Sequence, residues 1–405
     1  MRPHKYSFGL AFGVALCLAM PLNTLLAVPP TVVYPTGVWP DDVNNVQAAV
    51  SAGGIVLLKA VNSSGTPTAF NFGTPELLPG RKVLIEANVT IRGESVGAAR
   101  TTIQGGLSPF SGFTAVSRRI TGIDFKGPGI SAIGILASKD SLDVSGNRIS
   151  GLVPVRNGVG FTETEGVFVS GFDSHAVSGS VRVAGNEIDL STSTAQFRFG
   201  IQLDSINADV DISENEISVG QSPIIGRVID SEGIALLRCH ARVHVSENIV
   251  RLGTNPVYLG IDGAGDADAT FDISDNLVLN DSPSADGIVL QGGGFNSGIV
   301  GGRITGNVVI NHGSQYGAIS LYGLVSDVTV AGNSISGDGA YGLLVSFAYG
   351  TDKAVGNRLL GNELESFKAG VADVYLDANS QNTTVRGECG TVIDLGINNS
   401  VSCED

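Results

Sequence analysis

The sequence predicts an all-β protein, a single-stranded right-handed parallel β-helix, or solenoid, with a short N-terminal capping helix. Two observations carry this prediction, a glycine-rich composition and a repeat centred on asparagine. Glycine supplies 55 of the 405 residues, about twice its usual share of ~7%, and charged residues make up 16% against a usual ~25%. A chain of this length exceeds what one ordinary core accommodates, whereas stacked repeats have no such limit.

The repeat has an apolar residue three positions before each asparagine and another two positions after it. The residue directly before the asparagine is glycine or acidic, as a left-handed turn favours. This pattern predicts a strand, a tight turn and a second strand with apolar side chains facing inward. Stacked asparagine amides can both donate and accept, so we expect a structural ladder. Its eight members are Asn147, Asn186, Asn215, Asn248, Asn276, Asn307, Asn333 and Asn357.

A second element, of the form Gly-Ile-x-Leu, precedes each asparagine by about 13 to 20 residues, as in Gly200–Leu203 and Gly233–Leu236. Each repeat therefore holds about three short strands and no long helix. Equivalent strands must stack in parallel at ~4.8 Å, because a repeat that advances in one direction cannot return as a hairpin. The usual crossover rule makes the coil right-handed.

On this Val/Ile-x-Gly-Asn-x-Ile unit, the chain resembles the right-handed parallel β-helix repeat proteins of the pectin-lyase-like superfold. The resemblance covers residues 41–387 and points to no specific subfamily. It implies that residues 41–50, with apolar positions at helical spacing, form a helix that caps the first coil. It is nearly silent on function, because this fold carries lyases, hydrolases, epimerases, surface proteins and phage spikes.

The two ends of the chain predict export and a closed C-terminus. Residues 1–27 read as a signal peptide, with Arg2 and Lys5 before an apolar run too short to span a bilayer. Residues 28–40 are a linker, and residues 388–405 a C-terminal cap in which Cys389 and Cys403 are expected to pair. The mature protein would be secreted, periplasmic or on the cell surface, with no membrane contact. Cys239 is left as a buried small hydrophobe.

Charge excludes one class of partner and predicts a second ladder. The formal net charge of −15 argues against nucleic acid. Four positions before each asparagine, the side chains should face outward, and their signs alternate. Adjacent coils would pair them as ions, although a ligand strip is the alternative. This structural charge ladder comprises Asp143, Arg182, Asp211, His244, Asp272 and Arg303.

One acidic segment could bind a metal. Asp266, Asp268, Asp272 and Asp275 offer the oxygen ligands that Ca²⁺ prefers, but without the glycine and terminal glutamate of an EF-hand loop. A solvated acidic loop is the competing interpretation, and no other cofactor is expected.

Candidate catalytic residues lie on the outward side of the Gly-Ile-x-Leu strands. Hydrolysis on this scaffold needs paired carboxylates, and a lyase needs a base and a cation that neutralises the substrate acid. The two outward columns contain no basic residue, and Asp204 and Asp262 face out one whole coil apart. Glu232 is a third candidate. The motifs of polygalacturonase-like and pectate-lyase-like enzymes are absent, so the resemblance carries over no catalytic residue.

The position just before the strand glycine is rich in aromatic and acidic residues, which could stack on sugars and hydrogen-bond to them. The alternative is that these are turn residues at the start of a strand. The sugar-binding candidates are Glu165, Phe199, Glu232, Asp286, Tyr316 and Tyr341. A third feature, an outward seam of Val289, Ile319 and Leu344, would suit an oligomer.

These observations predict an exported β-helix protein with a carbohydrate-binding or structural surface role and no proven catalysis. The first alternative is a carbohydrate-active enzyme, either a polysaccharide lyase or a glycoside hydrolase. The second is an oligomeric spike or adhesin, so the chain would be a monomer or a homotrimer. The partner under the first two interpretations is a polysaccharide.

Overall fold

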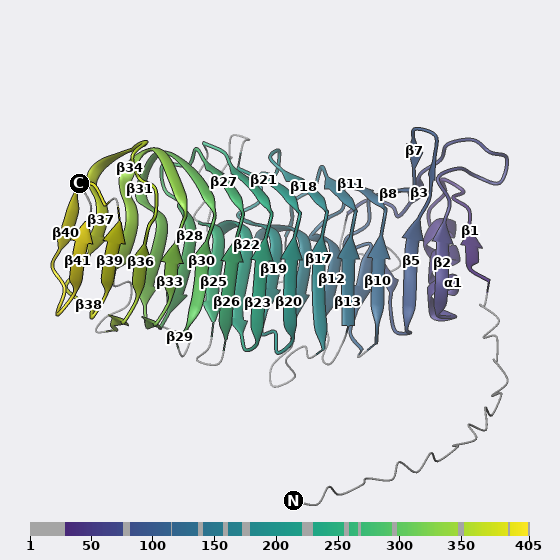
Figure 1. Cartoon of the computed structure of the whole chain (residues 1–405). Helices are drawn as coiled ribbons and strands as arrows, with labels where there is room; N and C mark the ends of the chain where they lie inside the picture. The colour runs from purple at the N-terminus through teal and green to yellow at the C-terminus, as the bar shows by residue number, and fades with distance from the viewer. Residues whose placement is uncertain are drawn as a thin grey trace, which may run out of the picture.

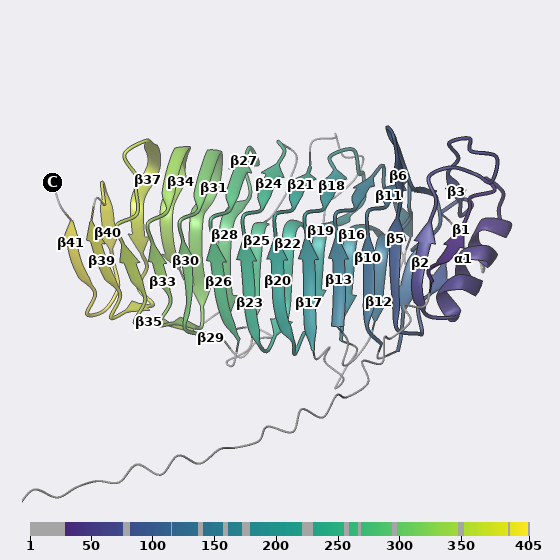
Figure 2. The same cartoon turned by 45° about the vertical axis from the view of Figure 1, so that its right-hand side comes forward.

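The chain folds as a right-handed parallel β-helix, as the sequence predicted. The structure, a computed structural model, describes residues 29–75, 82–114, 116–136, 141–156, 161–171, 179–220, 230–254, 259–265, 269–293, 298–346, 352–387 and 389–403. The predicted signal peptide lies outside these residues. The coils stack into an elongated body with the helix at one end and the C-terminus at the other (Figures 1 and 2).

One face of the β-helix is a 14-stranded sheet in which every pairing is parallel. In spatial order its strands are β1 (Thr31–Val33), β2 (Gly54–Leu58), β5 (Val89–Gly93), β10 (Arg118–Thr121), β13 (Ser141–Ser145), β17 (Ser180–Ala184), β20 (Asp209–Ser213), β23 (Arg242–Ser246), β26 (Thr270–Ser274), β30 (Gly302–Thr305), β33 (Thr329–Ala331), β36 (Arg358–Leu360), β39 (Thr384–Gly387) and β41 (Ser400–Cys403).

The other faces form a 21-stranded sheet, parallel except where β15 pairs with β16. Its strands are β3 (Phe70–Asn71), β4 (Val83–Leu84), β8 (Thr102–Gln104), β9 (Phe110–Gly112), β11 (Asp124–Lys126), β12 (Ser131–Leu136), β14 (Arg148–Ser150), β15 (Val155–Arg156), β16 (Thr162–Ser170), β18 (Glu187–Leu190), β19 (Phe197–Asp204), β21 (Glu216–Val219), β22 (Asp230–Cys239), β24 (Ile249–Leu252), β25 (Leu259–Gly265), β27 (Leu277–Asn280), β28 (Asp286–Gly292), β31 (Val308–Gly323), β34 (Ser334–Ser346), β37 (Phe367–Leu376) and β40 (Val392–Asp394).

Two small sheets complete the described strands. A parallel four-stranded sheet lies at one corner of the later coils, and an antiparallel pair forms a hairpin near the N-terminal end. They consist of β29 (Ile299–Val300), β32 (Val325–Ser326), β35 (Ala354–Val355) and β38 (Ser380–Gln381), and of β6 (Ser95–Val96) and β7 (Ala99–Arg100).

The apolar columns of the repeat form one continuous core inside the coil. Val183, Ile212 and Val245, three residues before successive asparagines, are fully buried, as are Ile201 and Ile234 of the Gly-Ile-x-Leu strands. Stacking these side chains removes them from water and stabilises the fold by roughly 1.5–3 kcal/mol each. The β-helix therefore needs no second domain to cover its sheets.

The glycine of the Gly-Ile-x-Leu element lies where two coils approach closely. A Cβ on Gly233 would meet Val250 Cγ1 and the carbonyl oxygen of Gly260 on the next coil. Only glycine fits at position 233 without a shift of its neighbours, and this close approach explains why small residues recur at the position along the sequence.

The asparagine ladder runs through the core side of the turns. The Oδ1 of each member accepts from the backbone N–H and the Nδ2 of the preceding member, at 2.8–3.2 Å. The residue before it is in the left-handed region, as at Glu214, Glu247 and Asp275 with φ of 57–58°.

The sequence prediction was wrong for the last member. Asn333 donates to Asn362, whereas Asn357 accepts from the backbone of Val328 outside the ladder. Strand β36 pairs with β33 so that Thr329 faces Arg358, and this register puts position 362 above 333.

A helix closes the N-terminal end of the coil. Helix α1 (Asp41–Ser51) covers the first coil with Val43, Val46 and Val50 buried. The buried Asp42 carboxylate fixes its start by accepting from the backbone N–H groups of Gly37 and Asn71 at 3.0 and 2.8 Å.

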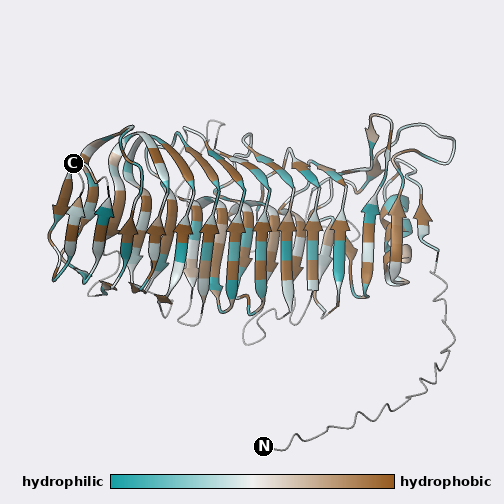
Figure 3. Cartoon of the chain, in the orientation of Figure 1, coloured by the Kyte–Doolittle hydropathy of each residue, from teal (hydrophilic) through white to brown (hydrophobic). Residues whose placement is uncertain are grey.

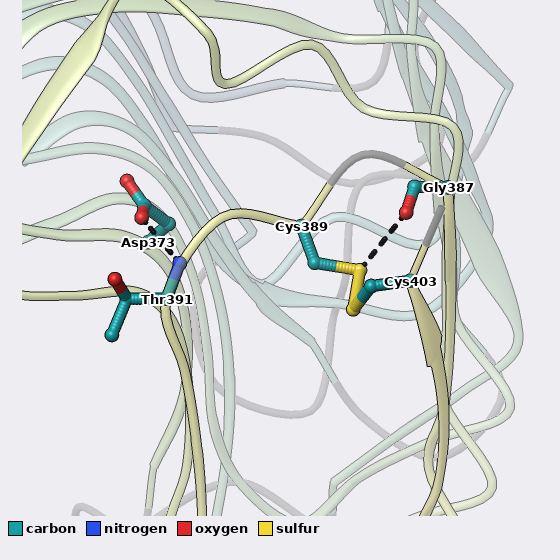
Figure 4. Close-up of a disulfide and its surroundings, with 5 residues drawn as sticks. All are labelled: Asp373, Gly387, Cys389, Thr391 and Cys403. Atoms are coloured by element: carbon teal, nitrogen blue, oxygen red, sulfur yellow. Dashed lines mark hydrogen bonds between the residues drawn. A yellow bond between two sulfur atoms is a disulfide. The ribbon is translucent and has the colours of Figure 1, made fainter. Parts of the chain in front are cut away.

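At the C-terminal end, Cys389 and Cys403 form a disulfide, shown in Figure 4. Nearby, the Thr391 backbone N–H donates to Asp373 Oδ2 at 2.7 Å. Cys239 is buried with a free thiol. None of the helices in the described ranges is long and apolar enough to cross a membrane.

The outward charge column lies on the 14-stranded sheet, where hydrophilic bands recur on successive strands in Figure 3. Its six members, Asp143 to Arg303, follow one another in strand register. Arg182 lies 3.4 Å from both Asp143 and Asp211, and Asp272 lies 2.6 Å from Arg303 and 3.6 Å from His244. These pairs are partly exposed, and such pairs contribute roughly 0–1 kcal/mol each.

Candidate functional site

On the outward face of the 21-stranded sheet, residues that pair across successive strands line up in columns, and four of these columns matter here. The first contains Glu163, Phe197 and Asp230, and the second, two residues later, Glu165, Phe199, Glu232, Leu259 and Asp286. The third contains Phe168, Gln202, Ala235, Asp262, Val289, Ser320 and Leu344, and the fourth Ser170, Asp204, Leu237, Ala264, Gln291 and Tyr322.

Four carboxyl groups gather on three consecutive coils of this face. We call Asp230, Glu232, Asp262 and Asp286 the acidic cluster. Asp230 and Glu232 lie on β22, Asp262 on β25 and Asp286 on β28. Glu232, Asp262 and Asp286 are only 3%, 1% and 3% exposed. Parallel stacking brings them together because each coil places its residues ~4.8 Å from the next.

Asp286 is held as a hydrogen-bond acceptor by three donors. The Ser320 hydroxyl, the Tyr322 hydroxyl at 2.8 Å and the Gly317 backbone N–H at 3.1 Å all donate to its Oδ1. Burial raises the pKa of Asp286 to about 6, and these three hydrogen bonds limit the rise. Asp286 is therefore the carboxyl group of the buried trio that ionises most readily near neutral pH.

Asp262 has a different environment. One donor, Gln291 Nε2, lies 2.8 Å from its Oδ2, and its buried Oδ1 accepts no hydrogen bond from the described residues. Burial, followed by the charges of Asp230 and Asp286, raises the pKa of Asp262 to about 8. It is therefore protonated at neutral pH, when most of Asp286 is ionised.

Glu232 completes the cluster as a second buried acid with a raised pKa. Burial raises its pKa well above the ordinary range, with Asp262 and Asp230 adding to the effect. The carboxyl groups of Glu232 and Asp230 are in hydrogen-bonding contact, while the buried Oε2 of Glu232 has no donor among the described residues. Arg198, fully buried on β19, has a pKa lowered to about 10 by desolvation.

A second acid pair lies two coils nearer the N-terminus. Glu163 and Glu165 occupy the same columns as Asp230 and Glu232, with Phe197 and Phe199 on the coil between. Burial and then the neighbouring Glu163 raise the pKa of Glu165 well above its usual range. Sequence reasoning missed Glu163 and Asp230. The available signal was that each lies two residues before an acid already chosen as a candidate, Glu165 or Glu232.

The structure separates the other catalytic candidate from this cluster. Asp204 lies in the fourth column and is bound by Arg238, whose Nε is 2.8 Å from Asp204 Oδ1. The Asp204 carboxylate is therefore engaged by an arginine of the next coil and lies outside the acidic cluster. The two remaining catalytic candidates, Asp262 and Glu232, do lie together.

Among the sugar-binding candidates, the register places Phe199 and Tyr341 in the second column but not Tyr316. Gly317 pairs with Tyr341 and faces Asp286, so Tyr316 lies one position outside. Phe199 is buried, at 4% exposure, whereas Tyr316 is 46% exposed. Tyr341 packs against Tyr375, with ring centres 5.2 Å apart.

The predicted apolar seam was wrong. Ile319 points into the core, because Ala318 rather than Gly317 takes the glycine position of the repeat. Val289 and Leu344 are outward but buried. These three residues therefore offer no exposed surface for trimer formation.

Only two residues of the predicted calcium cluster fall within the described ranges. Asp266 and Asp268 lie outside the described residues. Asp272 belongs to the charge ladder, and Asp275 occupies a left-handed turn position. Within the described ranges, no three His, Cys, Asp or Glu side chains are arranged to hold a metal ion.

No protein-family model matches the chain, and no curated protein matches it. Two solved structures that are similar are a mutant of the periplasmic alginate epimerase AlgG and the A-module of the mannuronan C-5 epimerase AlgE4 of Azotobacter vinelandii. The first is 12% identical with a TM-score of 0.47, over 87% of this chain and 77% of that one. The second is 12% identical with a TM-score of 0.45, over 91% of this chain and 97% of that one.

Proposed function

We propose that the protein is an exported carbohydrate-active enzyme that hydrolyses a polysaccharide at the acidic cluster. The observation that carries this proposal is the pair Asp262 and Asp286, whose neighbours push their pKa values apart to about 8 and about 6. A glycosidase needs one protonated and one ionised carboxyl group at the same pH. Strongly perturbed acids gathered on one face are typical of catalytic sites.

In this mechanism Asp262 is the general acid and Asp286 the base. Asp262 would donate its proton to the oxygen of the breaking glycosidic bond, since a neutral leaving group departs more easily. Asp286 would accept a proton from the attacking water, or attack the sugar directly. Glu232 is a positioning residue, since its carboxyl group contacts Asp230 and lies close enough to Asp262 for the two to influence each other's pKa. Activity should therefore be highest between about pH 6 and pH 8.

The lack of cationic residues among the described members of the four columns favours hydrolysis over elimination. A lyase must neutralise the acid group of its substrate with a cation. The described members of the four columns include no lysine, arginine or histidine. The two similar epimerases contribute nothing to this choice of reaction.

The second candidate function is polysaccharide binding without catalysis, and burial favours it. Glu232, Asp262 and Asp286 are at most 3% exposed, so a substrate reaches them only if the surrounding side chains that bury them move aside. Under this alternative the acidic cluster is structural, and sugars bind elsewhere on the same face.

The test is the incubation of the protein with a panel of neutral and acidic polysaccharides, followed by product analysis. New reducing ends indicate hydrolysis, unsaturated ends a lyase, and a changed sugar composition an epimerase. Asp262→Asn should lower kcat about 10²- to 10⁴-fold, and Asp286→Asn should do the same. The matched control is Asp211→Asn, a partly exposed aspartate on the other sheet. Equal activity of wild type and Asp262→Asn, or no product from any polymer, would overturn the proposal.

A further inference from the structure

A pocket of about 250 Å³ opens on the outward face of the 21-stranded sheet, toward the N-terminal end from the acidic cluster. It exists because small residues occupy the first positions of the third column. Ser111 on β9 pairs with Gly134 on β12, and the next residue along the column is the bulky Phe168. Ser108 and Ser131, whose hydroxyl groups lie 3.0 Å apart, are equally small. Two coils of small residues before a large one leave a depression.

The walls of this pocket combine an aromatic surface with acids. The Phe113 ring is 50% exposed, and Lys82 Nζ lies 5.2 Å from its centre. Phe168 forms a second aromatic wall. The Glu165 side chain, only 3% exposed, also lines the pocket and contacts Glu163. We call this the Glu165 pocket.

We propose that the Glu165 pocket binds one ring of a neutral sugar, so that it is a subsite for the polysaccharide of the proposed function, on which this inference rests. The C–H face of a sugar ring packs on phenylalanine, and its hydroxyl groups are hydrogen-bonded by serine and by a carboxyl group. Pockets for larger ligands are ~300–1,000 Å³, so this one accommodates a single ring. A sugar carboxylate is disfavoured, because the two acids Glu163 and Glu165 outnumber the one cation, Lys82, among the described lining residues.

The pocket and the acidic cluster are near enough to hold one chain. Glu165 and Glu232 occupy the same column with Phe199 between them. Two coil spacings of ~4.8 Å separate their backbones by about 10 Å. Asp262 is one coil further, so about 14 Å separates the two sites along the helix axis. A ring in the pocket would thus be a few sugar units from the bond that breaks, and short oligosaccharides would reach only one site.

The first test measures binding and does not depend on catalysis. Methyl glycosides of glucose, galactose, mannose, N-acetylglucosamine and glucuronic acid are titrated into the whole protein, with saturation-transfer NMR as the readout. We expect at least one neutral glycoside to bind with transfer from phenylalanine protons. Phe113→Ala should weaken that binding about 3- to 10-fold, and Ser111→Leu, which fills the depression, should abolish it. Tyr34→Ala, another half-exposed aromatic residue, is the matched control and should bind as the wild type does.

Three outcomes would overturn the inference. They are no binding of any neutral glycoside, binding that survives Ser111→Leu in a variant with a wild-type circular dichroism spectrum, or tighter binding of the glucuronide than of every neutral glycoside.

The second test separates this inference from the proposed function. Oligosaccharides of increasing length are hydrolysed by wild type and by Phe113→Ala. The subsite predicts that KM falls once the chain spans both sites, and that Phe113→Ala raises KM for long chains without changing kcat. Hydrolysis with no effect of Phe113→Ala would sink the subsite and leave the enzyme. Glycoside binding without hydrolysis of any polymer would sink the enzyme and leave the sugar pocket.

Discussion

Replacing Asp262 by asparagine should flatten the pH dependence of folding stability. Asp262 has a pKa of about 8 in the folded chain, against an ordinary value of 3.8. A carboxyl group whose pKa is raised on folding stabilises the fold below its unfolded pKa, and this contribution is lost as the pH rises through the folded value. Between those two values the folded chain holds one more proton than the unfolded chain. The free energy of unfolding then falls by about 1.4 kcal/mol for each unit of pH.

From pH 5 to pH 7, Asp262 alone should therefore lower the free energy of unfolding of the wild type by about 2.7 kcal/mol. An asparagine at this position cannot titrate but keeps an oxygen for the Gln291 amide, so Asp262→Asn should lose that much less across the same range. Urea unfolding followed by circular dichroism at pH 5, 6 and 7 measures both curves. Asp211→Asn, whose side chain is 42% exposed, should run parallel to the wild type.

The reasoning would be refuted if the curve of Asp262→Asn also ran parallel to the wild type. Asp262 would then be ionised in the folded protein at neutral pH, and its assignment as a general acid would fall with it.

Two further predictions concern the parts of the fold that the repeat builds. Asn248→Ala removes the amide that donates to Asn276 and accepts from Asn215, and it leaves these buried partners unsatisfied. The substitution should lower the free energy of unfolding in urea by about 3 kcal/mol or more. The control Asn399→Ala, near the C-terminus, should lower it by under about 1 kcal/mol. Cys403→Ser opens a disulfide whose cysteines are 14 residues apart, which should cost about 3 kcal/mol and speed hydrogen exchange in β39 and β41; unchanged exchange there would contradict a role for the disulfide in closing the last coil.

The sequence predicted the core and the charge ladder well because both follow from local periodicity. Apolar residues at fixed distances from each asparagine must face one way, and alternation along a strand then puts the charges on the other side. Once strands stack in register, columns read from the sequence become neighbours in space. This is why counting back from each asparagine is enough to align Asp143, Arg182 and Asp211 correctly.

Prediction failed where the period changed or where a residue type was ambiguous. Residues 356–362 contain two Gly-Asn pairs, and only the pairing of β36 with β33 selects Asn362 over Asn357. At β31 the sequence Gly317-Ala318-Ile319 offers two residues small enough for the glycine position. The structure uses Ala318, which leaves the Gly317 N–H free to donate to Asp286.

The candidate site was predicted only in part, for a different reason. The position of Asp262 on the outward face follows from alternation along the strand. The choice of Glu232 follows from the acids that recur at its position of the repeat. Their burial does not, since it depends on what covers the face, and no local pattern encodes that. The pKa values of these groups follow from burial first and from neighbouring acids second. Sequence reasoning therefore found residues of the cluster without finding its chemistry.

Charged residues are arranged in opposite ways on the two faces of the β-helix, and this contrast supports a functional acidic cluster. On the 14-stranded sheet the column from Asp143 to Arg303 alternates in sign from coil to coil, if His244 counts as a cation, so that every neighbour is attractive. On the 21-stranded sheet, Glu232, Asp262 and Asp286 are buried on consecutive coils, and burial first and neighbouring carboxyl groups second raise the pKa values of Glu232 and Asp262. Such an arrangement destabilises the fold at neutral pH. Selection removes destabilising residues that serve no purpose, whereas active sites keep them.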